Sequence, residues 1–324
     1  MKAISIASLM LGAALAVPAM AQVMQDGSMK VRAISPEIRR GAPSDIYVMK
    51  FEPTQITFRE NAQTKEIRTL PPSRFTSFYV FAPDDFEKAN QAFADSNYKD
   101  ARTMFANMKR KYAQTSVIPH SLASTAAYKE LVSAMRLMDW SGAKALADQY
   151  PVRASELTPE MANEVAVAKI MGLIPDKQWD KILSEAKAIK SLKKNLNLYQ
   201  LSQLYYAEGL ANSAKKNVVQ AIQDFSVAAV ISHGANREIS ADAMKNVIDL
   251  YMGMDEVKKF IATTPGTTLM ANSIAARPYS VRQAAAFYHM YNLMFPNQPL
   301  PDSYKVLEKY YINSQLKKAA EAAK

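Results

Sequence analysis

The spacing of apolar residues along the chain changes close to residue 83. Before it, short runs at 46–51, 55–59 and 75–81 are rich in β-branched and aromatic residues, and turn-prone or charged residues separate them. Such runs predict short strands joined by turns. After Pro83, apolar residues recur every three or four positions, which predicts a succession of helices. We expect a small β-rich or partly disordered segment over 22–82, a helical domain over 83–316 and a frayed tail over 317–324.

Six of the expected helices begin with a bulky residue directly after a turn. A spacing of 39 residues separates three of the successive pairs, and the other two steps are 42 and 47 residues. A repeat of this length is typical of stacked helical hairpins, in which each hairpin leaves an apolar face that its neighbour covers. We therefore expect a mostly α-helical fold, a right-handed α-solenoid of about six hairpins. The six opening residues are Tyr98, Trp140, Trp179, Val218, Val257 and Tyr304.

One hairpin carries a recognisable motif. The segment Ala89-x8-Tyr98-x2-Ala101-x3-Phe105-x2-Met108-x3-Tyr112 resembles the tetratricopeptide repeat, most closely the exported versions of the Tol-associated periplasmic and outer-membrane-assembly proteins. The motif recurs more loosely at Val218-x2-Ala221-x3-Phe225-x2-Ala228. The spacing exceeds the usual repeat length of about 34 residues, which leaves another α-solenoid class open.

The resemblance implies that the first helix of each hairpin lines a groove that binds a protein or peptide. Counting back from the opening residues places Thr125 and Asp242 on this face. The residues that we expect to contact a partner there are Tyr128, Arg136, Gln203, Tyr206, Lys245 and Asp249.

The first 21 residues have the pattern of a signal peptide. Lys2 supplies a positive charge, 4–17 an apolar core and 19–21 a small-x-small cleavage site. The apolar core is too short to span a bilayer, and no later run of about 18 apolar residues occurs. We expect an exported, soluble protein of a Gram-negative bacterium, periplasmic or secreted, without a transmembrane segment in the mature chain.

The amino-acid composition excludes several kinds of site and indicates the charge of the partners. The chain has no cysteine, which excludes disulfides, a lipid-modified cysteine, thiolate metal ligands and cysteine nucleophiles. A net charge of +10 favours anionic partners, and outside the cytoplasm these are lipid headgroups, anionic glycans or acidic proteins rather than nucleic acid. The densest basic stretch gives a candidate patch for such a partner, made of Lys187, Lys190, Lys193 and Lys194.

Sequence motifs for catalysis are missing. His120, His233 and His289 lack partners at metal-ligand spacing, and no glycine-rich phosphate loop or nucleophile elbow occurs. The Glu-Ser dipeptide of lytic transglycosylases is absent as well. We expect no catalytic residue, cofactor or metal, and a scaffold or adaptor that binds an envelope protein or peptide. The alternatives are an envelope glycan-binding or peptidoglycan-binding protein that uses basic and aromatic side chains, and, more weakly, a carboxylate-dependent glycan-cleaving enzyme.

Overall fold

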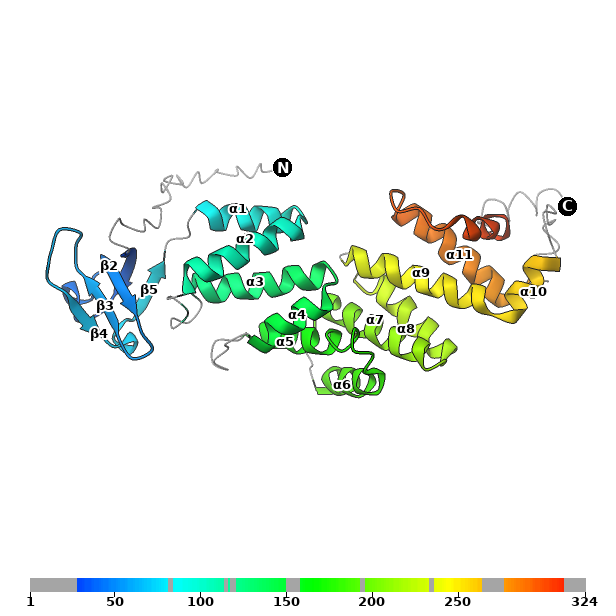
Figure 1. The fold of residues 1–324 in the computed structure, drawn as a ribbon, viewed down its shortest axis with the longest axis horizontal. Helices are drawn as coiled ribbons and strands as arrows, with labels where there is room; N and C mark the ends of the chain where they lie inside the picture. The colour runs from blue at the N-terminus through cyan, green and yellow to red at the C-terminus, as the bar shows by residue number, and fades with distance from the viewer. Residues whose placement is uncertain are drawn as a thin grey trace, which may run out of the picture. The chain divides into compact units, whose positions relative to one another are not determined.

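The computed structural model describes residues 28–80, 84–113, 116, 121–149, 158–192, 196–232, 236–263 and 277–311. It is mostly helical, with a small antiparallel sheet near the N-terminus (Figure 1). The chain divides into two compact units, Met1–Ala127 and Tyr128–Lys324. The first helical hairpin therefore belongs to the same unit as the sheet. The predicted signal peptide and C-terminal tail lie outside the described residues.

The sheet of the first unit has five strands in the order β4-β3-β2-β1-β5. Alternate side chains along its central strands are buried, for example Val31 and Ala33 of β1, which accounts for the alternating sequence pattern. Val48 of β2 lies opposite Phe58 of β3, and both are buried. The strands are β1 Met29–Ile34, β2 Ser44–Phe51, β3 Ile56–Arg59, β4 Arg68–Leu70 and β5 Ser77–Val80.

The observed strands differ in part from those predicted from the sequence. The three predicted runs coincide with most of β2 and with all of β3 and β5, but β1 and β4 were not predicted. Strand β1 lies within the stretch that we expected to be partly disordered, and it pairs with β2 and β5. Its alternation of Met29, Val31 and Ala33 with polar residues is short and ends on a small side chain, so the apolar signal is weak. Pairing on both sides stabilises it nonetheless.

Two helices, α1 Asp84–Ala94 and α2 Tyr98–Lys111, complete the described hairpin of the first unit. Ala89 and Ala101 are wholly buried, and their short side chains let the two helices approach closely. Phe105 fills the space beside this contact and meets the ring of Phe86 edge to face at 6.1 Å. The two helices share one apolar core with the sheet.

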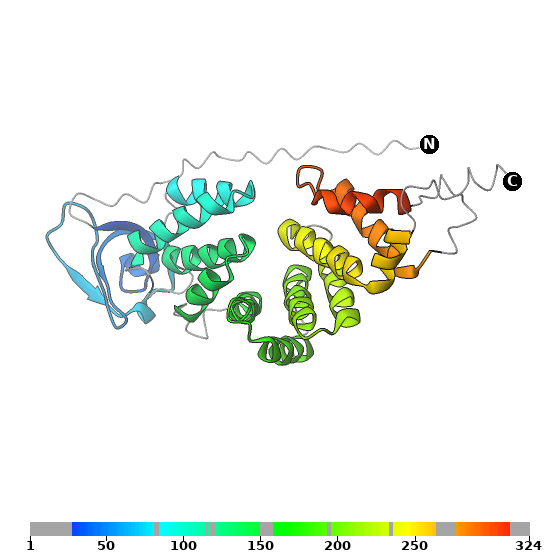
Figure 2. The ribbon, with the colours of Figure 1, turned by 45° about the vertical axis from the view of Figure 1, so that its right-hand side comes forward.

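The second unit consists of helices that follow one another in space in the order of the chain (Figures 1 and 2). One apolar core runs through the unit. No helix of the described residues is long and apolar enough to cross a bilayer. Helix α3 Leu122–Arg136 extends into this unit, and the others are α4 Trp140–Gln149, α5 Pro159–Met171, α6 Trp179–Leu192, α7 Leu198–Ala214, α8 Val218–Val230, α9 Arg237–Gly253, α10 Asp255–Thr263, α11 Tyr279–Met294 and the 3-10 helix η6 Asp302–Tyr310.

Four hairpins share one turn. In each, a residue with φ between 53° and 63° stands two positions before the second helix. The N–H of the next residue bonds to the carbonyl five positions back, as from Asn97 to Ala92 at 2.8 Å and from Asn217 to Asn212 at 2.9 Å. This is a Schellman motif that leads directly into the following helix. The left-handed residues are Ser96, Met138, Lys177 and Lys216.

The predicted opening residues are confirmed for these four hairpins and wrong for the last two. Helices α2, α4, α6 and α8 begin at the predicted residues. Helix α10 begins at Asp255 rather than Val257, because it follows α9 after one intervening residue instead of a Schellman turn. Tyr304 lies inside the 3-10 helix η6, which begins just after Pro301.

Candidate functional site

Helix α7 holds the centre of the predicted partner-binding face. It starts with a capping box, in which the Asn197 side chain accepts from the Gln200 N–H and the Gln200 side chain accepts from the Asn197 N–H. Gln200, Gln203 and Tyr206 follow at intervals of three residues and therefore share one side of the helix. Gln200 and Gln203 are 0% exposed and Tyr206 is 4% exposed. This polar side of α7 is thus covered by neighbouring helices.

At the start of α7, polar side chains join it to α5. Gln200 Nε2 donates to Glu164 Oε2 at 3.0 Å and to the carbonyl of Glu160 at 3.3 Å. Asn197 Nδ2 donates to Glu160 Oε1 at 3.1 Å. Burial raises the pKa of Glu164, while the Gln200 hydrogen bond and the charge of Arg136 oppose this rise. We call Glu160, Glu164, Asn197 and Gln200 the α5–α7 cluster.

Arg136, at the end of α3, lies beside this cluster. Its guanidinium carbon stands 3.1 Å from the centroid of the Tyr199 ring, a stacked cation–π arrangement. Arg136 is half-buried, and so is Tyr128, eight residues earlier on the same helix. The predicted site residue Arg136 thus forms part of the contact between helices α3 and α7.

Further along α7, a second group of polar side chains joins it to α9. Tyr206 donates its hydroxyl proton to Asp242 Oδ2 at 2.6 Å, and Asn246 Nδ2 donates to the same oxygen at 2.9 Å. Burial and the nearby charge of Asp242 raise the pKa of Tyr206, so the phenol remains protonated and acts as a donor. We call Tyr206, Asp242 and Asn246 the α7–α9 cluster.

Gln203 lies on α7 between these two clusters. Among the described residues, neither its Oε1 nor its Nε2 has a hydrogen-bond partner, although both atoms are buried. A buried amide without partners destabilises the folded state by roughly 1–3 kcal/mol relative to a satisfied one. Gln203 is therefore the least satisfied polar residue on this face of α7.

The exposed part of the predicted face lies on α9. Lys245 and Asp249 are both exposed and stand four residues apart on the same side of the helix. Partial desolvation raises the pKa of Asp249, Lys245 opposes the rise and Asp242 adds to it. Of the six predicted contact residues, these two are the ones open to a partner, while Tyr128 and Arg136 are half-buried and Gln203 and Tyr206 are buried.

Several residues of these clusters were not predicted from the sequence. Glu164 and Gln200 make the hydrogen bond that joins α5 to α7, and Asn246 donates to Asp242, the α9 residue that accepts from Tyr206. A signal for Gln200 was present in the sequence, since Asn197-x2-Gln200 has the spacing of a capping box. Glu164 gave no such signal because its partner lies on another helix, and Asn246 was not predicted although its partner Asp242 lies four residues earlier on α9.

One lysine of the candidate basic patch is exposed, one forms contacts within the fold, and two lie outside the described residues. Lys187 is exposed. Lys190 forms an ion pair with Glu208, and its ammonium group lies 4.0 Å from the centroid of the Tyr205 ring. Burial raises the pKa of Glu208, which the Lys190 hydrogen bond opposes. The remaining predicted members, Lys193 and Lys194, lie outside the described residues.

Reactive groups in the second unit are engaged in structural contacts. Buried Asp224 accepts from Asn212 at 2.7 Å and from Gln220 at 2.9 Å. His289 stacks on Tyr311 with ring centroids 3.9 Å apart, while His120 and His233 lie outside the described residues. Within the described ranges, no group of three or more histidine, aspartate or glutamate side chains could hold a metal ion.

Comparison with known proteins gives no relative. No protein-family model, no curated protein and no solved structure matches the chain. Any assignment of function therefore depends on the residues and contacts described above.

Proposed function

We propose that the protein is a non-catalytic scaffold or adaptor of the cell envelope that binds a protein or peptide through the first helices of its hairpins. In this proposal the second unit is a right-handed, tetratricopeptide-like solenoid. The observation that carries it is the pair of polar clusters that join α5 to α7 and α7 to α9. These contacts hold three successive first helices in a fixed register, as a preformed binding surface requires.

A rigid surface of this kind favours binding because little of its own conformational freedom is lost on docking. The reachable part is the α9 surface around Lys245 and Asp249. These two side chains carry opposite charges at neighbouring positions, so a partner segment with the complementary order of charges fits best. Asn246 and Asp242, both half-buried beside them, add hydrogen-bonding groups at the edge of the same surface.

A charge swap tests the proposal. The chain carrying Lys245→Glu and Asp249→Lys keeps the net charge but reverses the order of charges on α9. The matched control, Glu256→Lys with Lys258→Glu, makes the same exchange at exposed positions of α10. In affinity capture from native envelope extract with quantitative mass spectrometry, we expect the α9 swap to reduce partner recovery at least tenfold and the α10 swap to leave it unchanged.

Two results would contradict the proposal. One is an unchanged set of captured partners in the α9 variant. The other is an equal loss in both variants, which would show that the site is not on α9. Binding to purified sacculi without any captured protein would favour the glycan-binding alternative, and Lys187→Glu would then be the first substitution to examine on that surface.

A further inference from the structure

The turn between β1 and β2 has an unusual backbone. Arg39 has φ 46°, Arg40 has φ 54° and Gly41 has φ 84°, so three successive residues are left-handed. Glycine adopts this conformation readily, whereas a side chain with a Cβ meets the neighbouring carbonyl there. Two arginines thus occupy positions at which glycine or asparagine would be more stable. Unfavourable backbone of this kind persists only where the surrounding structure holds it, and it is concentrated at functional sites.

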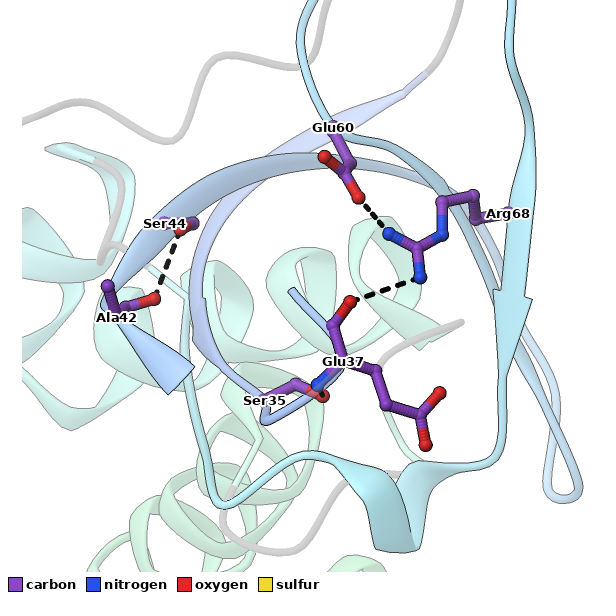
Figure 3. Close-up of polar contacts among 6 residues, drawn as sticks. All are labelled: Ser35, Glu37, Ala42, Ser44, Glu60 and Arg68. Atoms are coloured by element: carbon purple, nitrogen blue, oxygen red, sulfur yellow. Dashed lines mark hydrogen bonds and ion pairs between the residues drawn. The ribbon is translucent and has the colours of Figure 1, made fainter. Parts of the chain in front are cut away.

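Side chains from both ends of the turn hold it in this conformation (Figure 3). Ser35 Oγ accepts from the Glu37 N–H at 3.3 Å, and Ser44 Oγ donates to the Ala42 carbonyl at 3.1 Å. Arg68, on strand β4, donates from Nη2 to the Glu37 carbonyl at 3.1 Å. The side chains that fix the turn therefore flank the arginine pair, and the arginines contribute to its hydrogen bonds only through the Arg39 carbonyl, which accepts from the Ala42 N–H at 3.2 Å.

The Ile38 side chain, only 1% exposed, fastens the same turn to the core of the sheet. Arg39 and Arg40 directly follow it and are both exposed. The buried isoleucine and the two exposed arginines together make a rigid, cationic tip.

The acidic residues near this tip already have partners. Glu37 pairs with Arg74 at 3.3 Å, and Glu60 pairs with Arg68. In contrast, neither Arg39 nor Arg40 forms an ion pair with any described residue. Two guanidinium groups on a fixed turn are thus available to an anion from outside the chain.

We propose that the Arg39–Arg40 turn binds the phosphate groups of anionic phospholipids and docks the sheet unit on a membrane surface. The planar guanidinium presents paired N–H donors that match phosphate oxygens. Ile67, directly before Arg68, is 55% exposed and adds an exposed apolar side chain to the same unit. Cationic and apolar side chains together are typical of surfaces that lie at a lipid interface. This site is separate from the partner-binding surface proposed on α9.

Vesicle co-sedimentation tests this site. The chain starting at Gln22 is used, because the apolar stretch 4–17 would enter lipid by itself. The vesicles contain phosphatidylglycerol and phosphatidylcholine in a ratio of about 1:3, and pure phosphatidylcholine vesicles serve as the neutral reference. One arginine near an anionic surface contributes about fivefold to the partition coefficient. We therefore expect Arg39→Gln with Arg40→Gln to lower binding to the anionic vesicles roughly 25-fold at low salt.

Two further variants separate the site from general charge and from misfolding. Lys65→Gln with Lys99→Gln removes the same charge from exposed positions of the same unit, and we expect less than a threefold loss. Arg39→Gly with Arg40→Gly suits the left-handed backbone and keeps the turn folded, and it should lose binding as the glutamine pair does. Equal losses in the lysine and arginine pairs, or full binding by the glycine pair, would overturn the proposal.

A phosphate titration distinguishes the lipid from the free ion. With inorganic phosphate alone, calorimetry should show no binding below the millimolar range, because a single ion lacks the array of headgroups that a membrane presents. Tight binding of inorganic phosphate together with absence of the chain from anionic vesicles would overturn the membrane assignment.

Discussion

The contact between α7 and α8 gives the sharpest test of the packing. Gly209 of α7 lies against the ring of Phe225, which is wholly buried in α8. A Cβ at Gly209 would stand 2.7 to 2.9 Å from three ring carbons. Ordinary carbon–carbon contacts are about 3.5–4.0 Å, so the ring would have to retreat by nearly 1 Å. Tyr206, whose ring centroid lies 5.9 Å from that of Phe225, limits this movement.

Two opposing effects determine how much Gly209→Ala changes the free energy of unfolding. Overpacking a buried contact destabilises by about 1–3 kcal/mol. Alanine in a helix interior stabilises by about 1 kcal/mol relative to glycine. Taking the middle of the first range, we expect a net loss of about 1 kcal/mol in the free energy of unfolding, which corresponds to a melting temperature lower by roughly 2–4 °C.

Urea and thermal unfolding followed by circular dichroism measure this difference. The matched control is Gly253→Ala in α9, where no heavy atom lies within 4 Å of the new Cβ. It should be neutral or more stable by up to about 1 kcal/mol. The double variant Gly209→Ala with Phe225→Leu should lose less free energy of unfolding than the sum of the two single variants. The smaller leucine side chain leaves room for the new methyl group. A Gly209→Ala protein as stable as the wild type would refute the α7–α8 packing described here.

Three further substitutions test other parts of the structure. Trp140→Ala should lose about 3–5 kcal/mol of unfolding free energy in urea, because its ring is buried in the helical core, and an unchanged midpoint would contradict this. Burial raises the pKa of Glu164 above its ordinary 4.5, so the stability associated with its protonated form is present at low pH and lost as pH rises. Glu164→Gln should therefore be more stable than the wild type at pH 7, with a gain that shrinks towards pH 4; a gain independent of pH would refute the assignment. Arg40→Gly should raise the free energy of unfolding, measured by thermal denaturation, by about 1 kcal/mol, because glycine adopts the left-handed backbone readily. A lower value would show that the arginine side chain stabilises the turn.

The helical hairpins were predictable where helix stripes and turn signals agreed. Ala101, Phe105 and Met108 of α2 were expected to face the core and are buried. Thr158 was expected to cap α5 before Pro159, and its hydroxyl accepts from the Met161 N–H. Both signals are local, since a stripe or a cap is encoded within one helical segment. Strand β1 depends on partner strands elsewhere in the chain, and α10 follows α9 without the expected turn; at both places the prediction was wrong.

The candidate site was harder to predict because its geometry depends on contacts between helices. The repeat register placed Gln203 and Tyr206 on the first-helix face, and the structure places them on one side of α7. The register says nothing of how closely α5 and α9 approach that side. Both approach closely enough to bury it, so the two residues contact other helices instead of solvent.

The burial of polar groups on α7 bears on how the hairpins find their register. An apolar helix face could shift along its neighbours with little loss of stabilising free energy, because the hydrophobic effect is not directional. The hydrogen bonds of Gln200 to Glu164 and of Tyr206 to Asp242 form at one register only. Breaking one would leave a buried polar group without a partner, at a cost of about 1–3 kcal/mol. We infer that these clusters select the arrangement of the first helices, while the apolar core that runs through the second unit stabilises it without fixing a register.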